Sequence, residues 1–279
     1  MRVRRLPVIR GGVLLATLAL AGCVAPGANA PQQAAIDSGP NDPWENTNRS
    51  IFGFNQKVDE NVLVPVAEGY RQVVPPPVRQ SVHDFMQNLN EPVIFANDVL
   101  QGQGQLAGNT FGRLALNTTI GVGGLFDIAT PIGIPYHSND FGVTLANWGF
   151  PDGPYLILPV LGPSNVRDLA GKIGDGAADP GNIVASNYHY LWATVARAAT
   201  EGIDLRSRNI ETLNDIQKTS LDYYATIRSL YQQRRAAEIR HEGTNLPNPS
   251  PFGGGDSGSS EPSMSYSVAP PVPPQGPPR

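Results

Sequence analysis

Helix-breaking residues interrupt this chain at close intervals, and they limit the secondary structure that it can form more than any other feature. The sequence contains 30 glycines and 27 prolines among 279 residues, and both residue types destabilise the interior of a helix. Between the breaks, apolar residues still recur at helical spacing, as at Val78, Val82, Phe85 and Leu89. No alternation typical of a strand extends beyond four or five residues. The sequence therefore predicts a mostly α-helical fold made of short amphipathic segments.

Capping and breaking residues indicate where these helices begin and end. Asp42–Glu45 combines a capping residue, a proline suited to the first helical position and a glutamate, so we expect a helix to start there. Pro65 and Pro75–Pro77 are expected to end the helices that precede them, and a further helix is expected to end before Pro92. Other helices are expected over residues 93–101, 106–117, 182–199 and 208–240, with a short one capped by Ser164. Residues 118–163 are dense in glycine and proline and are expected to be irregular.

The first 23 residues have the order of segments found in a lipoprotein export signal. Four arginines precede an apolar run over residues 13–21, and Leu20–Cys23 (LAGC) closes it in the manner of a bacterial lipobox. Cys23, the single cysteine, is then expected to be acylated and to become the mature N-terminus. Each acyl chain contributes about 0.8 kcal/mol per buried methylene, so we expect membrane attachment through Cys23. The alternative is a free cysteine near an ordinary cleavage site.

Composition divides the chain into four segments. Residues 1–22 are the predicted signal peptide, residues 23–41 a lipidated flexible tether, residues 42–240 one helical domain, and residues 241–279 a disordered tail rich in proline, glycine and serine.

The sequence signals of several function classes are missing. The chain has no GxSxG string, no second histidine at zincin spacing and no Walker A string. Removal of the signal peptide takes away four arginines and no acid, which leaves an acidic chain without the electrostatic basis for nucleic-acid binding. After Cys23, no apolar run approaches the ~20 residues that a spanning helix needs. We therefore expect no enzymatic activity, no metal, no cofactor and no nucleic acid.

Two acidic groups are weaker candidates for chemistry. Residues 175–182 (DGAADPGN) lack the spacing and terminal glutamate of a calcium loop. Asp42 with Glu45, or Asp59 with Glu60, would pair as acid and base, but helix capping and a solvated helix face are the favoured explanation of these acids.

Five segments of the chain resemble the MlaA (VacJ) lipoprotein family. They are DPWENTNRSIFGFNQKVDENVLVPVAEGY (42–70), NLNEPVIFANDVLQG (88–102), GRLALNTTIGVGGLFDIAT (112–130), DFGVTLANWGFPDGPYLILPVLGPSNVRD (140–168) and ETLNDIQKTSLDYYATIRSLYQQRR (211–235). The resemblance implies a ring-like arrangement of amphipathic helices around a channel, held in the inner leaflet of a Gram-negative outer membrane. The segment 131–139 and the tail after residue 240 lie outside it.

The resemblance also implies a function and partners. Family members remove mislocalised phospholipids from the outer leaflet, pass them to the periplasmic carrier MlaC and so maintain lipid asymmetry. The implied partners are phospholipid, a trimeric outer-membrane porin and MlaC, and the implied location is the outer membrane, facing the periplasm. Two alternatives are a structural lipoprotein that scaffolds a porin and an envelope hydrolase with an unrecognised carboxylate site.

A flexible loop borders the channel in this family, and residues 121–142 are its counterpart here. The candidate hinge, acyl-contact and loop-holding residues are Gly121, Gly123, Gly124, Leu125, Phe126, Asp127, Ile128, Asp140, Phe141 and Gly142. A static cluster of turns within a compact core is the alternative. Trp148, Tyr155 and Trp192 are candidates for an aromatic belt at a membrane interface.

Overall fold

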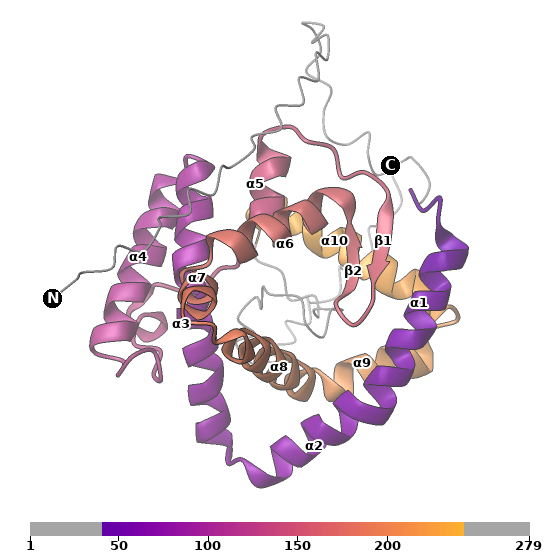
Figure 1. Cartoon of the computed structure of the whole chain (residues 1–279), viewed down its shortest axis with the longest axis horizontal. Helices are drawn as coiled ribbons and strands as arrows, with labels where there is room; N and C mark the ends of the chain where they lie inside the picture. The colour runs from indigo at the N-terminus through magenta and orange to yellow at the C-terminus, as the bar shows by residue number, and fades with distance from the viewer. Residues whose placement is uncertain (1–40, 243–279) are drawn as a thin grey trace, which may run out of the picture. The chain divides into compact units, whose positions relative to one another are not determined.

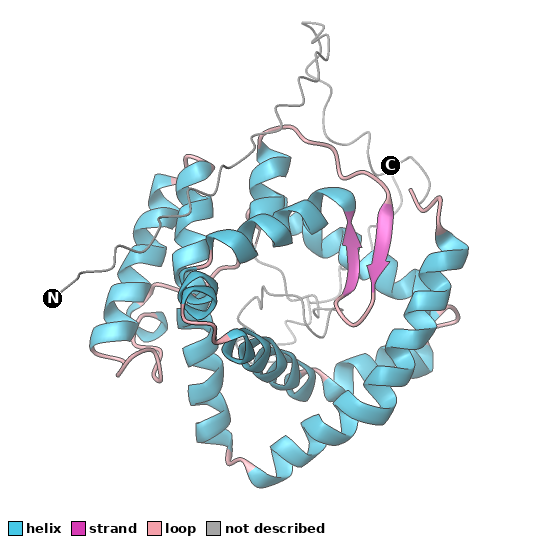
Figure 2. Cartoon of the chain, in the orientation of Figure 1, coloured by secondary structure: helices cyan, strands magenta, loops and turns pink. Residues whose placement is uncertain are grey.

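The computed structural model describes residues 41–242, which are mostly helical with one small antiparallel sheet (Figure 2). The predicted signal peptide, the acylation of Cys23 and the tail after residue 242 lie outside the described residues.

The elements follow one another in short segments along the chain. The first are α1 (Glu45–Val58), the π-helix η2 (Asp59–Leu63), α2 (Val64–Val73), α3 (Pro76–Leu100), α4 (Gly104–Thr119), the 3-10 helix η3 (Thr130–Ile132) and α5 (Phe141–Asn147). After these come β1 (Tyr155–Leu158), β2 (Gly162–Asn165), α6 (Val166–Ala178), α7 (Pro180–Asn187), α8 (Leu191–Arg208), α9 (Ile210–Thr219) and α10 (Tyr223–Ile239). The two strands pair with Tyr155 opposite Asn165 and Leu158 opposite Gly162.

Contacts between these elements close the described residues into a circuit (Figure 1). α1, η2 and α2 lead to α3, which packs on α4 and α5. α5 packs on α6 and α10, α10 packs on β2, and β1 packs back on α1. α8 packs on both α2 and α3. The expected ring-like, mostly α-helical arrangement is confirmed.

Two proline predictions are wrong. Pro65 does not end a helix, because α1 continues through the π turn of η2 and Pro65 lies in the first turn of α2, where the missing N–H costs little. Pro92 lies inside α3, whose long contact with α4 holds the helix together across the lost hydrogen bond. The prolines at 75–77 do separate α2 from α3, since Pro75 has extended backbone angles ahead of the first turn of α3.

Three other boundaries differ from the prediction. The helix expected over 182–199 is two helices, because the backbone turns at His189, where φ is +58°. The helix expected over 208–240 is also two, interrupted at residues 220–222. Asn165 rather than Ser164 caps α6, by accepting a hydrogen bond from the backbone N–H of Asp168.

Asp42 ties the start of the described chain to α10 instead of capping α1. Its carboxylate accepts hydrogen bonds from Asn48 Nδ2 at 2.7 Å and Arg228 Nη1 at 2.9 Å, and from the hydroxyl of Tyr224. Helix α1 has no side-chain cap. The Asp42 carboxylate, expected to cap a helix, therefore makes a long-range contact with Arg228 instead. This hydrogen bond joins two charged groups in a partly buried position, where such bonds are strong.

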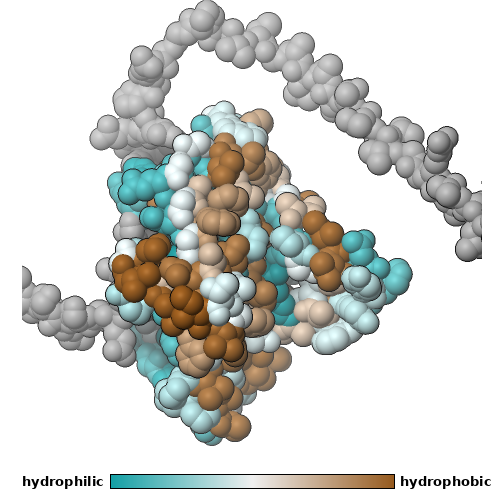
Figure 3. Space-filling view, turned by 90° about the vertical axis from the view of Figure 1, so that its left-hand side faces the viewer, coloured by the Kyte–Doolittle hydropathy of each residue, from teal (hydrophilic) through white to brown (hydrophobic). Residues whose placement is uncertain are grey.

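A hydrophobic core cluster lies between β1, α10 and α1. It consists of Tyr155, Ile157, Tyr224 and Tyr231, with Ile51 and Phe52 packed against it. Tyr155 is 3% exposed, so its candidate role at a membrane interface is wrong, whereas Trp148 and Trp192 are exposed. Many other large apolar side chains are exposed, and Figure 3 shows apolar atoms in a band on the side where α4 lies. Among the helices of residues 41–242, none combines the length and apolarity needed to cross a membrane.

Candidate functional site

The loop candidates from residue 121 to residue 128 lie in a tight turn directly after α4. We call residues 120–129 the α4–η3 turn. Backbone N–H groups of Gly121, Gly123 and Gly124 donate to carbonyls at the end of α4, and the N–H of Phe126 donates to Gly121 O at 3.0 Å. The turn is thus closed by its own backbone hydrogen bonds.

The glycines of this segment have different surroundings. A Cβ at Gly121 would lie 2.2 Å from the carbonyl oxygen of Phe126, and one at Gly124 would lie 2.5 Å from Asn88 Cβ. Gly142 is equally confined, by Arg235, Asp168 and Asp140. Gly123 has a positive φ of +72° and open space around it. Close packing thus requires glycine at three of these positions, and backbone conformation alone favours it at Gly123.

A buried arginine of α4 connects the turn to neighbouring elements through polar contacts. Arg113 is 1% exposed, and its Nε donates to Glu91 Oε1 at 2.7 Å. Its Nη1 donates to the Ile134 carbonyl oxygen at 2.6 Å, and its Nη2 lies 3.4 Å from Asp127 Oδ2. Burial raises the pKa of Glu91 to about 7 against the opposing effect of Arg113. The guanidinium therefore joins α3, α4, the turn and the segment beyond η3.

Asp127 organises the turn from within. It accepts hydrogen bonds from the backbone N–H groups of Ala129 and Thr130, both at 3.1 Å, and from Asn117 Nδ2 at 3.2 Å. Burial pushes the pKa of Asp127 up, but the hydrogen bonds from Thr130 and the charge of Arg113 outweigh this effect and lower it. Of the apolar residues in the turn, Leu125 and Phe126 are exposed and Ile128 is half-buried.

Phe141 and Gly142 belong to a different cluster, formed by α5, α6 and α10. The Phe141 ring packs edge-on against Trp148 at a centroid distance of 5.8 Å. Asp140 caps α5 through Val143 N–H and pairs with Arg235 at 2.7 Å. Although burial raises the pKa of Asp140, the charge of Arg235 lowers it to about 2. The structure thus brings residues 121–128 together and places 140–142 in a second polar cluster.

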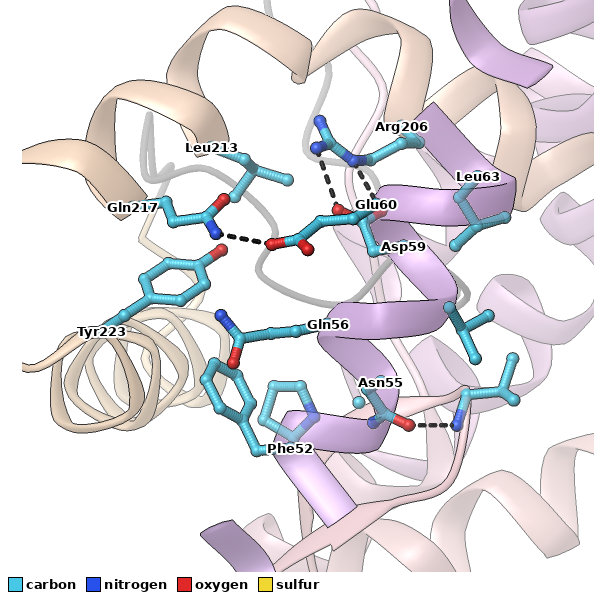
Figure 4. Close-up of a pocket in the computed structure, with 14 residues that line it drawn as sticks. Phe52, Asn55, Gln56, Asp59, Glu60, Leu63, Arg206, Leu213, Gln217 and Tyr223 are labelled. Carbon is cyan, nitrogen blue, oxygen red and sulfur yellow. Dashed lines mark hydrogen bonds and ion pairs between the residues drawn. The ribbon is translucent and has the colours of Figure 1, made fainter. Parts of the chain in front are cut away.

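A pocket lined by α1, η2, α8, α9, α10 and the β1–β2 hairpin was not predicted from the sequence. We call it the π-helix pocket; it is a half-open hollow, and the space beside its lining residues amounts to about 640 Å³ when the adjoining open solvent is counted. Its polar wall includes Asn55, Gln56, Asp59, Glu60, Arg206 and Gln217 (Figure 4). Its apolar and aromatic wall includes Phe52, Leu63, Val160, Pro163, Leu213 and Tyr223.

Two pairs of polar contacts shape this pocket. Arg206 Nε and Nη2 donate to the two oxygens of Asp59 at 2.8 and 3.0 Å. Gln217 Nε2 donates to Glu60 Oε1 at 3.0 Å, and Figure 4 shows the Tyr223 hydroxyl directed toward the same region. Burial and the nearby charge of Asp59 raise the pKa of Tyr223 to about 12.

One feature of the sequence indicated part of this pocket. Asp59 and Glu60 stand out as adjacent acids, but Arg206 and Gln217 lie about 150 positions away and only the closed circuit brings them near. The π turn that carries both acids is a feature often found at functional sites. Periodicity does not reveal it, because a π turn inserts one residue without changing the residue types.

The remaining acidic candidates have structural partners. Asp175 accepts from Asn97 Nδ2 and from the backbone N–H of Phe141, both at 2.8 Å, and Asp179 caps α7. Within residues 41–242, no group of three or more histidine, cysteine, aspartate or glutamate side chains is placed to hold a metal ion.

Comparison with known proteins gives consistent matches over the same residues that form the circuit. The family model described as MlaA lipoprotein matches residues 40–238. The Escherichia coli (strain K12) protein named intermembrane phospholipid transport system lipoprotein MlaA is 33% identical over 229 residues, covering 79% of this chain and 84% of that protein. An uncharacterized protein of Rickettsia bellii is 35% identical over 201 residues, covering 72% of this chain and 77% of that protein.

A solved structure agrees with these matches. It comes from work on the structural basis for maintenance of bacterial outer membrane lipid asymmetry, is 33% identical to this chain and superposes with a TM-score of 0.64. The match covers 71% of this chain and 98% of the solved one.

Proposed function

Because this chain belongs to the MlaA lipoprotein family, we propose that it acts in intermembrane phospholipid transport and so maintains the lipid asymmetry of the outer membrane. The observation that carries this proposal is the match over residues 40–238, which spans nearly all the described elements. The Escherichia coli relative bears that function in its name, and the solved structure was described in connection with lipid asymmetry.

The distribution of polar and apolar side chains supports a lipid cargo. Large apolar side chains such as Phe54, Phe111 and Trp192 are exposed on the outside of the helices, where amphipathic helices contact the apolar part of a bilayer. The π-helix pocket offers both polar and apolar walls. A phospholipid has a polar headgroup and two apolar chains, so a protein that moves it needs surfaces of both kinds.

The finer parts of the proposal rest on the sequence. Acylation of Cys23 would anchor the chain in the outer membrane with the helical domain facing the periplasm. A trimeric porin and the carrier MlaC are the proposed protein partners. The α4–η3 turn borders the lipid path, with the exposed Leu125 and Phe126 and the half-buried Ile128 available to acyl chains. Gly123, which has open space around it, is the proposed hinge.

No enzymatic step is part of this proposal. Transport of an intact phospholipid needs no covalent chemistry, and the acids suspected from the sequence have structural partners: Asp42 pairs with Arg228, and Asp59 pairs with Arg206. A hydrolase is therefore less favoured, and the match to a phospholipid-transport lipoprotein family disfavours a purely scaffolding role.

Purification from outer membranes in a mild detergent tests the proposal. We expect intact phospholipid and a trimeric porin to copurify with the full chain and to be identified by mass spectrometry. A preparation from outer membranes that contains the chain without bound phospholipid, and that also takes up none when phospholipid is supplied, would contradict the transport function.

A further inference from the structure

We propose that the π-helix pocket binds the ammonium group of a zwitterionic phospholipid headgroup, so that the chain favours ethanolamine-type phospholipids over anionic ones. This inference rests on the proposed function and adds the class of lipid that the chain selects. It is drawn from the charged side chains and aromatic rings that line the pocket and from the space between them.

The pocket has an excess of negative charge. Its lining contains two carboxylates, Asp59 and Glu60, and one guanidinium, Arg206. Arg206 is 2% exposed and donates to Asp59, to Asn214 Oδ1 at 3.1 Å and to the Asn209 carbonyl oxygen at 3.5 Å. Among the described residues, Glu60 accepts one hydrogen bond, from Gln217, and forms no ion pair. An ionised carboxylate accepts up to about four hydrogen bonds, so Glu60 has capacity left for a cation.

The aromatic wall has the same preference. The rings of Phe52 and Tyr223 lie 5.3 Å apart between centroids at an angle of 56°, and both line the pocket. The face of an aromatic ring carries negative charge density and attracts ammonium groups. Carboxylate and ring together form the combination that recognises alkylammonium ligands.

Neutral donors beside the carboxylate suit the phosphate that follows the ammonium in such a headgroup. A tyrosine hydroxyl is already protonated at neutral pH, and burial with the nearby charge of Asp59 raises the pKa of Tyr223 further, to about 12, so this hydroxyl is a neutral donor. Gln56 lines the pocket as well and carries an amide donor. Leu63 and Leu213 then offer apolar surface for the glycerol and the first methylenes.

An anionic headgroup lacks a partner here. The guanidinium of Arg206 is the one arginine or lysine group of the lining, and it is held by Asp59 at 2.8 and 3.0 Å. A phosphate followed by a neutral glycerol would bring its negative charge near Glu60 without an ammonium group to offset it. Like charges at close range disfavour binding. The pocket therefore discriminates by repulsion as well as by attraction.

The test uses the full-length lipoprotein in a non-ionic detergent, stripped of endogenous lipid. Native mass spectrometry measures binding of phosphatidylethanolamine and phosphatidylglycerol that carry the same acyl chains. We expect about threefold tighter binding of phosphatidylethanolamine, the ratio that a charge contact with a solvent-exposed carboxylate produces. Free phosphoethanolamine is expected to bind far more weakly, because it lacks the apolar part.

Variants assign the preference to the pocket. Glu60→Gln is expected to reduce the ratio between the two lipids to about one, and Phe52→Leu to weaken binding of phosphatidylethanolamine alone. Glu68→Gln is the matched control, because Glu68 is an exposed acid on α2 outside the pocket, and it should keep the ratio. Circular dichroism checks that each variant is folded.

The outcomes separate this inference from the proposed function. Equal binding of the two lipids by the folded wild-type chain, or an unchanged ratio in both Glu60→Gln and Phe52→Leu, overturns the headgroup assignment and leaves transport standing. Free phosphoethanolamine bound as tightly as the lipid would identify a site for a soluble amine instead. Binding of neither lipid would overturn the transport function itself.

Discussion

The α4–η3 turn and the π-helix pocket are both built around an arginine that is almost fully buried, yet they differ in what the neighbouring acids do. Around the turn, Arg113 is shared among Glu91, Asp127 and backbone carbonyl oxygen, so the polar groups satisfy one another. In the pocket, Arg206 is matched by Asp59 while Glu60 faces open space. Paired charges fix a shape, whereas an acid without an ionic partner is available to a ligand.

Removal of the two arginines gives the largest test of this difference. Arg113→Met leaves Glu91 buried and unpaired, so we expect the free energy of unfolding to fall by about 3–5 kcal/mol. Arg206→Met leaves Asp59, whose side chain is 25% exposed, and water can solvate it, so the loss should be smaller. Chemical denaturation followed by circular dichroism measures both. Equal losses would show that the two sites are built alike.

Glycine substitutions test how rigid the turn is. Gly121→Ala places a methyl group 2.2 Å from backbone oxygen, so we expect a loss of roughly 3 kcal/mol in stability. Gly123→Ala meets no atom within 4 Å and changes only the cost of a positive φ, about 1 kcal/mol. Thermal unfolding compares the two variants. A Gly121→Ala variant as stable as Gly123→Ala would indicate that the turn opens easily, as a hinge does.

A pH titration separates two acids of the α5–α6–α10 cluster. Burial raises the pKa of Asp175 to about 6, so its stabilising contribution is complete below its unfolded pKa near 3.8 and is lost as the pH rises through 6. Asp175→Asn removes this dependence, and between pH 4 and 7 the variant should gain about 2 kcal/mol relative to the wild type. Asp140, whose pKa is lowered to about 2, behaves oppositely, since its contribution is lost as the pH falls below 4.

Denaturation curves of Asp175→Asn and of the wild type at several pH values measure this. The prediction fails when the difference between Asp175→Asn and the wild type stays constant from pH 4 to pH 7.

The smallest expected effect is on the stability of the Glu60→Gln variant. Glu60 is exposed and has one hydrogen bond, from a glutamine that can also bond to an amide, so the free energy of unfolding should change by less than about 0.5 kcal/mol. Thermal unfolding in a non-ionic detergent checks this value. A loss comparable to that of Arg113→Met would mean that Glu60 serves the fold rather than a ligand.

Much of the fold was predictable because apolar periodicity survives in each helix. Periodicity predicted the mostly helical class, and the family resemblance implied the ring-like arrangement. Both are confirmed, and α4 lies close to its expected range. The breaks at Pro65 and Pro92 were wrong because a π turn and the packing of α3 on α4 compensate for the missing N–H groups. Neither effect has a signal in local sequence.

The site was less predictable than the fold. The loop residues were found through the family resemblance, but their sequence does not separate the tightly packed Gly121 from the open Gly123. The pocket joins Glu60 to Gln217 across 157 positions, and no periodic pattern links residues so far apart. Contacts of that kind depend on closure of the whole circuit.

Outer-leaflet phospholipid in a strain that lacks this chain tests the central claim most directly. The surface phospholipid of intact cells is measured with a membrane-impermeant amine reagent or an added phospholipase, in the deletion strain and after complementation. The account predicts more phospholipid in the outer leaflet on deletion, with return to the parental level when the full chain is restored. An unchanged amount of surface phospholipid on deletion would contradict it.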